Sequence, residues 1–160
     1  MSFSIRFTRE RVTDVARGEK AKFGEIVIGS YCERFFASLD YWRAFDYRNH
    51  WKTAITRIVE GKSRSSLITS MDDPAIAKRI FWRPMYRIGD MVYIQHQILF
   101  LDMLPTRFDE ENPFKFVKER ETVNENGEKI SEWFVSVREM EVFLRRDGGE
   151  SGRRRRTRGQ

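Results

Sequence analysis

Two histidines are the residues in this sequence best suited to supply an acid–base group. His50 stands beside Trp51 within an apolar pattern of helical period, and His96 stands between Gln95 and Gln97 in a strand-like run. Neither histidine has a sequence partner at the spacing that a catalytic dyad or a zinc site requires. We therefore expect both imidazoles to satisfy hydrogen bonds rather than to catalyse a reaction.

Cys32 is the one candidate for a nucleophilic thiol. It is the only cysteine, and a lone cysteine in an apolar strand is usually a small buried side chain. The sequence also lacks a P-loop, a zinc pattern and the GxSxG and GxGxxG motifs. These observations argue against a conventional enzyme and give no reason to expect a cofactor or a metal.

Carboxylates gather at two places where paired acids could hold a metal ion or act as acid and base. One pair is Asp72 and Asp73, and the other group is Asp109, Glu110 and Glu111. Both lie in predicted loops or at helix starts, where acidic residues are favoured because they cap the helix and interact with its dipole. A structural role is the simpler interpretation, and a role in chemistry or binding stays open.

The net charge of +6 is concentrated at the end of the chain. Residues 145–160 contain seven arginines against Asp147 and Glu150, so they carry +5 and leave +1 for residues 1–144. Four glycines interrupt this segment, and no apolar residue follows Leu144. We expect a single domain over residues 1–146 and a disordered Arg-rich tail over residues 147–160. If this chain contacts nucleic acid, the positive charge for that contact lies mainly in this tail.

The body of the chain has the composition of a folded, water-soluble domain. Its aromatic share of 14% argues against intrinsic disorder, because disordered chains lack large apolar side chains. No apolar run reaches the roughly 18 to 20 residues that span a bilayer, and residues 1–11 lack the apolar segment of a signal peptide. Since a single cysteine cannot form a disulfide within the chain, we expect a cytoplasmic protein without a membrane partner.

Apolar spacing predicts a central helix and several strands. From Asp46 to Val59 the apolar residues recur with the period of an amphipathic helix, and Gly61 follows where a helix commonly ends. A second helix is predicted over residues 138–146. Runs rich in β-branched and aromatic residues predict strands at residues 25–28, 31–36, 66–71, 80–88, 91–101, 117–123 and 129–137.

Two turn sequences suggest how the last four strands pair. Gly89 and Asp90 separate one pair of strands, and Asn126 and Gly127 separate the other. Each pair should form an antiparallel hairpin, with a bulge or a sheet edge at Pro84. The predicted fold class is therefore α+β, with antiparallel sheets, a central amphipathic helix and a C-terminal helix.

Five segments together carry a resemblance to a known family. They are residues 38–42 continuing through Asp46 and Tyr47 to Trp51, residues 66–71 with Pro74, and residues 92–95, 99–101 and 126–133. In order and spacing they resemble the immunity proteins of bacterial contact-dependent growth inhibition, the CdiI family, in the group that neutralises nuclease toxins of the Enterobacter type. The resemblance covers about residues 25–144.

The resemblance implies a sheet-and-helix domain similar to the Whirly fold and stoichiometric binding of a cognate toxin domain without catalysis. It does not transfer the contact residues, because cognate pairs differ in their surface residues. Since a nuclease carries positive charge to hold phosphates, its inhibitor should offer acidic side chains. Our candidates for toxin contact are the acidic residues of the predicted loops: Asp72, Asp73, Asp102, Asp109, Glu110 and Glu111.

Two other functions compete with toxin binding. An aromatic-rich sheet with an Arg-rich tail could bind single-stranded nucleic acid by stacking its bases. However, aromatic residues in strands with few interleaved lysines are more often core than platform. A pocket under the hairpins could instead hold a small ligand, as a substrate or as an effector.

Overall fold

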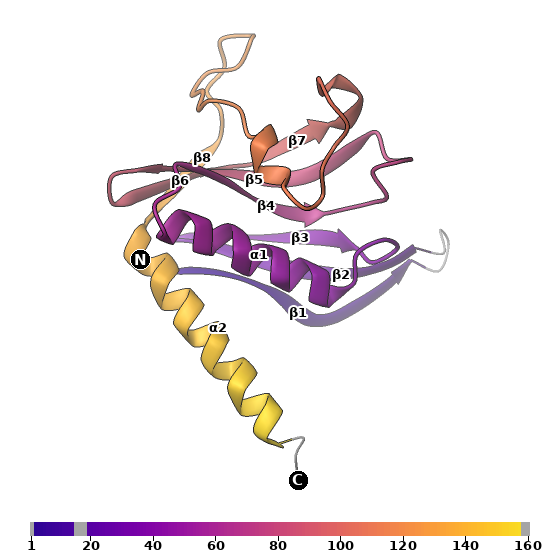
Figure 1. The fold of residues 1–160 in the computed structure, drawn as a ribbon, viewed down its shortest axis with the longest axis vertical. Coiled ribbons are helices and arrows are strands. Elements are labelled where there is room, and N and C mark those ends of the chain that lie inside the picture. Colours follow the sequence, from indigo (N-terminus) through magenta and orange to yellow (C-terminus); the bar gives the residue numbers. More distant parts are fainter. Residues whose placement is uncertain (1, 15–18, 158–160) are drawn as a thin grey trace.

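The computed structural model describes the backbone over residues 2–14 and 19–157, and side-chain burial over residues 2–10 and 20–147. Within these residues the chain forms two antiparallel sheets and two α-helices (Figure 1). Two short 3-10 helices, η1 (Leu101–Met103) and η2 (Pro113–Phe116), interrupt the loops. This arrangement confirms the predicted α+β class. No helix in the described ranges is long and apolar enough to cross a membrane.

The first sheet is a three-stranded meander of β1 (Phe3–Asp14), β2 (Glu19–Ile28) and β3 (Tyr31–Ser38). β2 turns tightly into β3 through Gly29, whose φ of 64° is readily adopted only by glycine. Ile5 of β1 pairs with Ile26 of β2, and both side chains are buried in the core. β1 was not predicted, although its apolar residues Phe3, Ile5 and Phe7 alternate with polar ones in the pattern of a half-buried strand.

The second sheet runs in the order β4-β5-β6-β8, and β7 also pairs with β5. Its strands are β4 (Arg64–Ser70), β5 (Arg79–Ile88), β6 (Met91–Gln95), β7 (Gln97–Phe100) and β8 (Glu132–Ser136). β6 and β7 are two halves of the predicted hairpin partner of β5, because Met85 pairs with Ile94 and Trp82 with Gln97 in one continuous register. Pro84 lies opposite the break and lacks the N–H that would continue the ladder.

The predicted hairpin around Asn126 and Gly127 is right in its turn and wrong in its strands. Gly127 has a φ of 78°, but the pairing beyond the turn is a single bridge between Val123 and Lys129. β8 pairs with β6 instead. The physical reason is burial: β8 places apolar side chains in the core, whereas residues 118–122 are mostly charged and would contribute little to a sheet.

Helix α1 (Ala44–Val59) is the amphipathic helix that the apolar spacing predicts. The Asp46 carboxylate accepts a hydrogen bond from the Arg43 N–H at 2.8 Å and satisfies a free donor at the helix start. The helix ends ahead of Gly61, whose φ is 107°. The buried residues confirm the predicted stripe and are Tyr47, Trp51, Ala54, Ile55 and Ile58.

Side chains of α1 cover the outer edge of β4. The Trp51 Nε1–H donates to the Ile68 carbonyl at 2.8 Å, and the His50 Nε2 accepts from the Ile68 N–H at 2.8 Å. The Tyr47 hydroxyl accepts from the Met71 N–H at 2.8 Å. Since β4 pairs with β5 on its other side, these bonds satisfy backbone groups that an uncovered edge strand would leave open.

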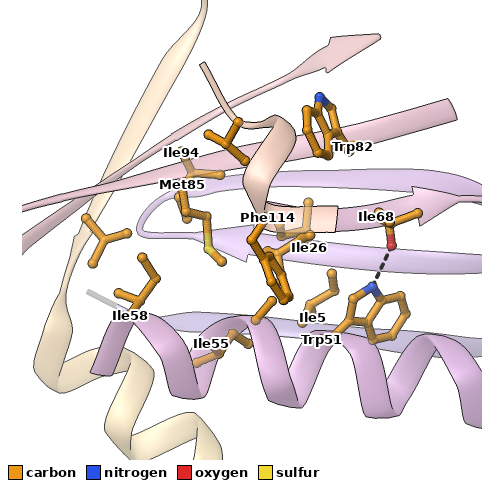
Figure 2. Packing of buried hydrophobic residues seen from close by; sticks show 14 of the residues in the cluster. Ile5, Ile26, Trp51, Ile55, Ile58, Ile68, Trp82, Met85, Ile94 and Phe114 are labelled. Atoms are coloured by element: carbon orange, nitrogen blue, oxygen red, sulfur yellow. Dashed lines mark hydrogen bonds between the residues drawn. The ribbon is translucent and has the colours of Figure 1, made fainter. Parts of the chain in front are cut away.

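The core lies where α1 meets both sheets, and Figure 2 shows its packing. The Trp51 ring lies 5.0 Å from the Phe7 ring of β1 and 5.8 Å from the Phe35 ring of β3, measured between centroids. Ile55 of α1 and Met85 of β5 are fully buried in the same cluster. One helix therefore holds the two sheets together.

Helix α2 (Val137–Thr157) begins where the sequence predicts, since the Ser136 hydroxyl accepts from the Glu139 N–H at 3.2 Å. Met140 is fully buried on its inner face. The backbone is helical as far as Thr157, and the side chains beyond Asp147 lie outside the described residues. The domain limit at residue 146 and the disorder of residues 147–160 stay predictions.

Replacing Trp51 with alanine should lower the free energy of unfolding by about 3 to 5 kcal/mol, because the change empties a buried site. Trp51→Phe keeps most of the ring volume and loses the hydrogen bond to Ile68, so it should cost less, about 1 to 3 kcal/mol. Denaturant unfolding at pH 7 measures both values. Wild-type stability in both variants would show that this helix face is not the centre of the core.

The neutral state of His50 should make the fold sensitive to acid. Its ring lies between those of Trp42 and Phe114, at 5.3 and 5.9 Å, and burial lowers its pKa to about 3. In the unfolded chain the pKa is about 6.5. The unfolded chain therefore takes up the proton first, and stability is lost as pH falls from 6.5 toward 3. At pH 5 we expect this histidine alone to cost about 2 kcal/mol.

His50→Gln provides the matched control, because glutamine keeps an acceptor for the Ile68 N–H and does not titrate. The variant should lose less stability than the wild type between pH 7 and pH 5. The His96→Gln variant should lose nearly as much stability over this range as the wild type. Parallel pH profiles of the wild type and the His50→Gln variant would contradict this account.

Candidate functional site

Acidic candidates meet where the ends of β3 and β4 come together. The Ser38 hydroxyl donates to Asp72 Oδ1 at 2.8 Å, and the Ser38 N–H donates to the Ser70 hydroxyl at 3.3 Å. The Tyr47 hydroxyl donates to the Ser38 carbonyl at 2.7 Å, so the same group that binds Met71 also holds the end of β3. These bonds fix Asp72 against the first sheet.

Asp73 begins the turn that leads into β5. Its Oδ1 accepts from the Ala75 N–H at 3.0 Å, and its carbonyl accepts from the Ala77 N–H at 2.7 Å. A side chain that bonds the backbone two residues on is an Asx turn, a common use of aspartate in loops. The turn places the carboxylate of Asp73 near the loop that follows β3.

Glu110 reaches the same place from the long loop before η2. The Tyr41 hydroxyl donates to Glu110 Oε2 at 2.5 Å, and the Trp42 indole donates to Oε1 at 3.2 Å. The hydrogen bond to Glu110, with partial burial and the charges of Glu110 and Asp73, raises the pKa of Tyr41 to about 12. Tyr41 therefore stays a donor at neutral pH and keeps Glu110 in place.

A hollow of about 550 Å³ opens between these loops. We call it the acidic hollow, and its lining residues are Asp40, Tyr41, Asp72, Asp73, Ile76, Ala77, Lys78 and Arg79. Asp40, Asp72 and Asp73 supply negative charge where the loops after β3 and β4 meet. Lys78 and Arg79 supply positive charge where β5 begins. Ile76 is 80% exposed and adds an apolar side chain to this lining.

The acidic hollow does not have the geometry of a metal centre. Among the side chains described, those of residues 2–10 and 20–147, no three histidines, cysteines, aspartates or glutamates lie close enough to hold a metal ion. Its carboxylates are separate, and Asp72 and Asp73 already accept hydrogen bonds from the protein. Dispersed acids around an exposed isoleucine and a tyrosine instead suit a polypeptide partner that carries basic side chains.

The other three acidic candidates lie around this cluster rather than in it. Asp109 accepts from the Lys115 ammonium at 3.3 Å, and this bond lowers the pKa of the Asp109 carboxyl. Glu111 is exposed, and its N–H donates to Asp109 Oδ1 at 3.0 Å. Asp102 lies in η1, which is tied to the start of β5. The structure thus brings Asp72, Asp73 and Glu110 together and leaves Asp102, Asp109 and Glu111 at their flanks.

Of the eight lining residues, sequence reasoning named Asp72 and Asp73 and missed six, among them Asp40, Tyr41 and Ile76. Asp40 follows a strand and precedes a helix, which is the same signal that singled out the other loop acids. Tyr41 offered no comparable signal, because its partner Glu110 is 69 residues away in the sequence. Ile76 could be recognised only by its exposure.

The histidines and the cysteine do not form a catalytic pair. His50 accepts a hydrogen bond from the Ile68 N–H at the edge of β4. His96 lies in the break between β6 and β7 rather than within a strand, and its Nδ1 is 4.0 Å from Glu33 Oε1. The Glu33 carboxylate also pairs with the buried Arg83 at 2.8 Å. Cys32 is exposed on β3, so the expectation that it is buried is wrong. It lies on the outward-facing side of a strand next to charged residues.

Comparison with known proteins identifies the family of this chain. The family described as the CdiI N-terminal domain matches residues 37–143, which include the whole acidic hollow. The immunity protein CdiI of Enterobacter cloacae subsp. cloacae is 33% identical over 126 residues, which are 79% of this chain and 86% of that protein. A chain of the solved CdiA-CT/CdiI toxin and immunity complex from Enterobacter cloacae superposes with a TM-score of 0.81 at 32% identity, covering 89% of this chain and 96% of that one. This chain therefore belongs to the CdiI immunity protein family.

Proposed function

We propose that this chain binds the toxin domain of a matching contact-dependent growth inhibition effector and neutralises it by stoichiometric binding. The observation that carries the proposal is the likeness, over 89% of the chain, to a chain of a solved toxin and immunity complex. CdiI immunity proteins are inhibitors rather than enzymes. The acidic hollow is the surface that fits such a partner best.

The proposal extends to the class of toxin and the place of binding. A nuclease must present positive charge to the phosphates of its substrate, and the carboxylates of the acidic hollow would complement that charge. We therefore propose a nuclease as the partner and the cytoplasm as the compartment. The likeness to the Whirly fold stays a prediction from the resemblance.

The acidic residues have different proposed roles according to their surroundings. Asp72 and Asp73 contact the toxin directly because they line the hollow, and Glu110 does so because it bonds Tyr41 of the same lining. Hydrogen bonds fix the positions of all three carboxylates. The flanking acids Asp102, Asp109 and Glu111 steer the encounter of the two proteins. Outlying charges of this kind raise the association rate more than they slow dissociation.

Asp72→Asn combined with Asp73→Asn tests this assignment without removing the acceptors for Ser38 and Ala75. The double variant should associate with the toxin domain on the order of tenfold more slowly at low ionic strength and should also dissociate faster, because direct contacts are lost. The difference should shrink at high ionic strength, because salt screens exposed charges. Stopped-flow or surface-binding kinetics with the toxin domain encoded beside this chain measure both rates.

Glu125→Gln combined with Glu128→Gln is the matched control, since it removes the same charge from the exposed turn at residues 124–128. This variant should associate nearly as fast as the wild type. Equal association rates for the two double variants and the wild type would remove the acidic hollow from the interface. Failure of the wild type itself to bind would count against the immunity function.

A further inference from the structure

The second sheet has one covered edge and one edge that is left partly open. Side chains of α1 cover the β4 edge, whereas β8 covers the opposite edge along β6 as far as the pair of Gln95 with Glu132. β7 continues the line of β6 beyond that pair (Figure 1). In the part of the chain that the structure describes, β7 pairs with β5 alone. The side of β7 that faces away from β5 has no strand beside it.

The backbone groups on this open side belong to Ile98 and Phe100. In an antiparallel pair, alternate residues direct their N–H and C=O toward and away from the neighbouring strand. The Leu101 N–H donates to the Lys78 carbonyl at 2.8 Å, so Leu99 and Leu101 direct their backbone groups toward β5. Ile98 and Phe100 direct theirs outward. Among the described residues, nothing forms a hydrogen bond with these outward groups.

The side chains on this edge do not protect it from another strand. Ile98 is 41% exposed and Phe100 is 45% exposed. Natural edge strands are commonly blocked by lysine, proline, a bulge or a covering element, and residues 97–100 contain neither lysine nor proline. An apolar, unblocked edge is a template for pairing with an extended segment.

The open edge is continuous with the acidic hollow. Phe100 pairs with Arg79, and the Leu101 N–H bonds the Lys78 carbonyl, while Lys78 and Arg79 line the hollow. Asp102 lies two residues after Phe100 and adds negative charge near this end of the edge. One partner could therefore reach the open edge and the hollow at the same time.

We propose that an extended segment of the toxin domain pairs with the open edge of β7 and adds a strand to the second sheet. This inference rests on the proposed function. The segment bonds the outward groups of Ile98 and Phe100, packs apolar side chains on theirs, and places a basic residue beside Asp102. A second copy of this chain fits less well, because a four-residue edge alone falls far short of the roughly 800 Å² that each partner buries in a stable interface.

Two pairs of variants separate backbone pairing from side-chain contact. Ile98→Ala and Phe100→Ala remove the side chains and keep the outward N–H groups, whereas Ile98→Pro and Phe100→Pro remove the N–H groups as well. Proline is tolerated at these positions of an edge strand because the lost N–H is not bonded within the sheet. Each proline variant should bind the toxin domain at least about tenfold more weakly than its alanine counterpart. Phe134→Ala, at an aromatic residue of β8 that is 50% exposed, should bind like the wild type.

Hydrogen exchange of the wild-type complex provides a second readout that needs no variant. The amide protons of Ile98 and Phe100 should exchange much more slowly with the toxin bound than without it. Equal affinities within each proline and alanine pair, or unprotected amides in a tight complex, would overturn the strand pairing and leave the proposed function intact. Protection by self-association in the absence of toxin would assign the edge to a second copy and overturn the inference. A wild type that does not bind the toxin domain would overturn both proposals.

Discussion

The hydrogen bonds between α1 and the edge of β4 are the constraint on which the rest of the structure depends. Trp51 and His50 bond the carbonyl and the N–H of Ile68, and Tyr47 bonds the N–H of Met71. The same three side chains belong to the aromatic core between the sheets. When α1 packs into the core, the same side chains provide hydrogen-bond partners for the backbone of β4. This pairing explains why polar atoms are tolerated in the core.

This constraint also builds the surface on which the function depends. The Tyr47 hydroxyl bonds the Ser38 carbonyl as well as the Met71 N–H, so the ends of β3 and β4 are held together above the helix. The loops that leave these ends carry the carboxylates of the acidic hollow. Burial raises the pKa of Tyr47, which keeps its hydroxyl protonated and able to donate. A rigid interior thus positions a charged exterior in advance, which lowers the entropic cost of binding.

Features that depend on nearby residues were predictable from the sequence, and features that depend on distant ones were not. The stripe of α1 that ends ahead of Gly61 and the interruption at Pro84 follow from spacing and from the chemistry of single residues. The partner of β8 was predicted wrongly. The local turn at Asn126 and Gly127 favours pairing with residues 117–123, whereas burial of the apolar side chains of β8 favours the distant edge of β6. At the site, loop acids could be named one by one. Their meeting around Tyr41 could not be foreseen, because it joins loops 69 residues apart.

A calorimetric titration of the intact chain with the toxin domain encoded beside it tests the central claim most directly. The account expects one toxin domain per chain and a dissociation constant in the nanomolar range, which corresponds to about −12 kcal/mol and requires a well-packed interface. It also expects the heat to depend on ionic strength, because opposite charges meet at the acidic hollow. Absence of binding at micromolar concentrations, with both proteins folded, would contradict it.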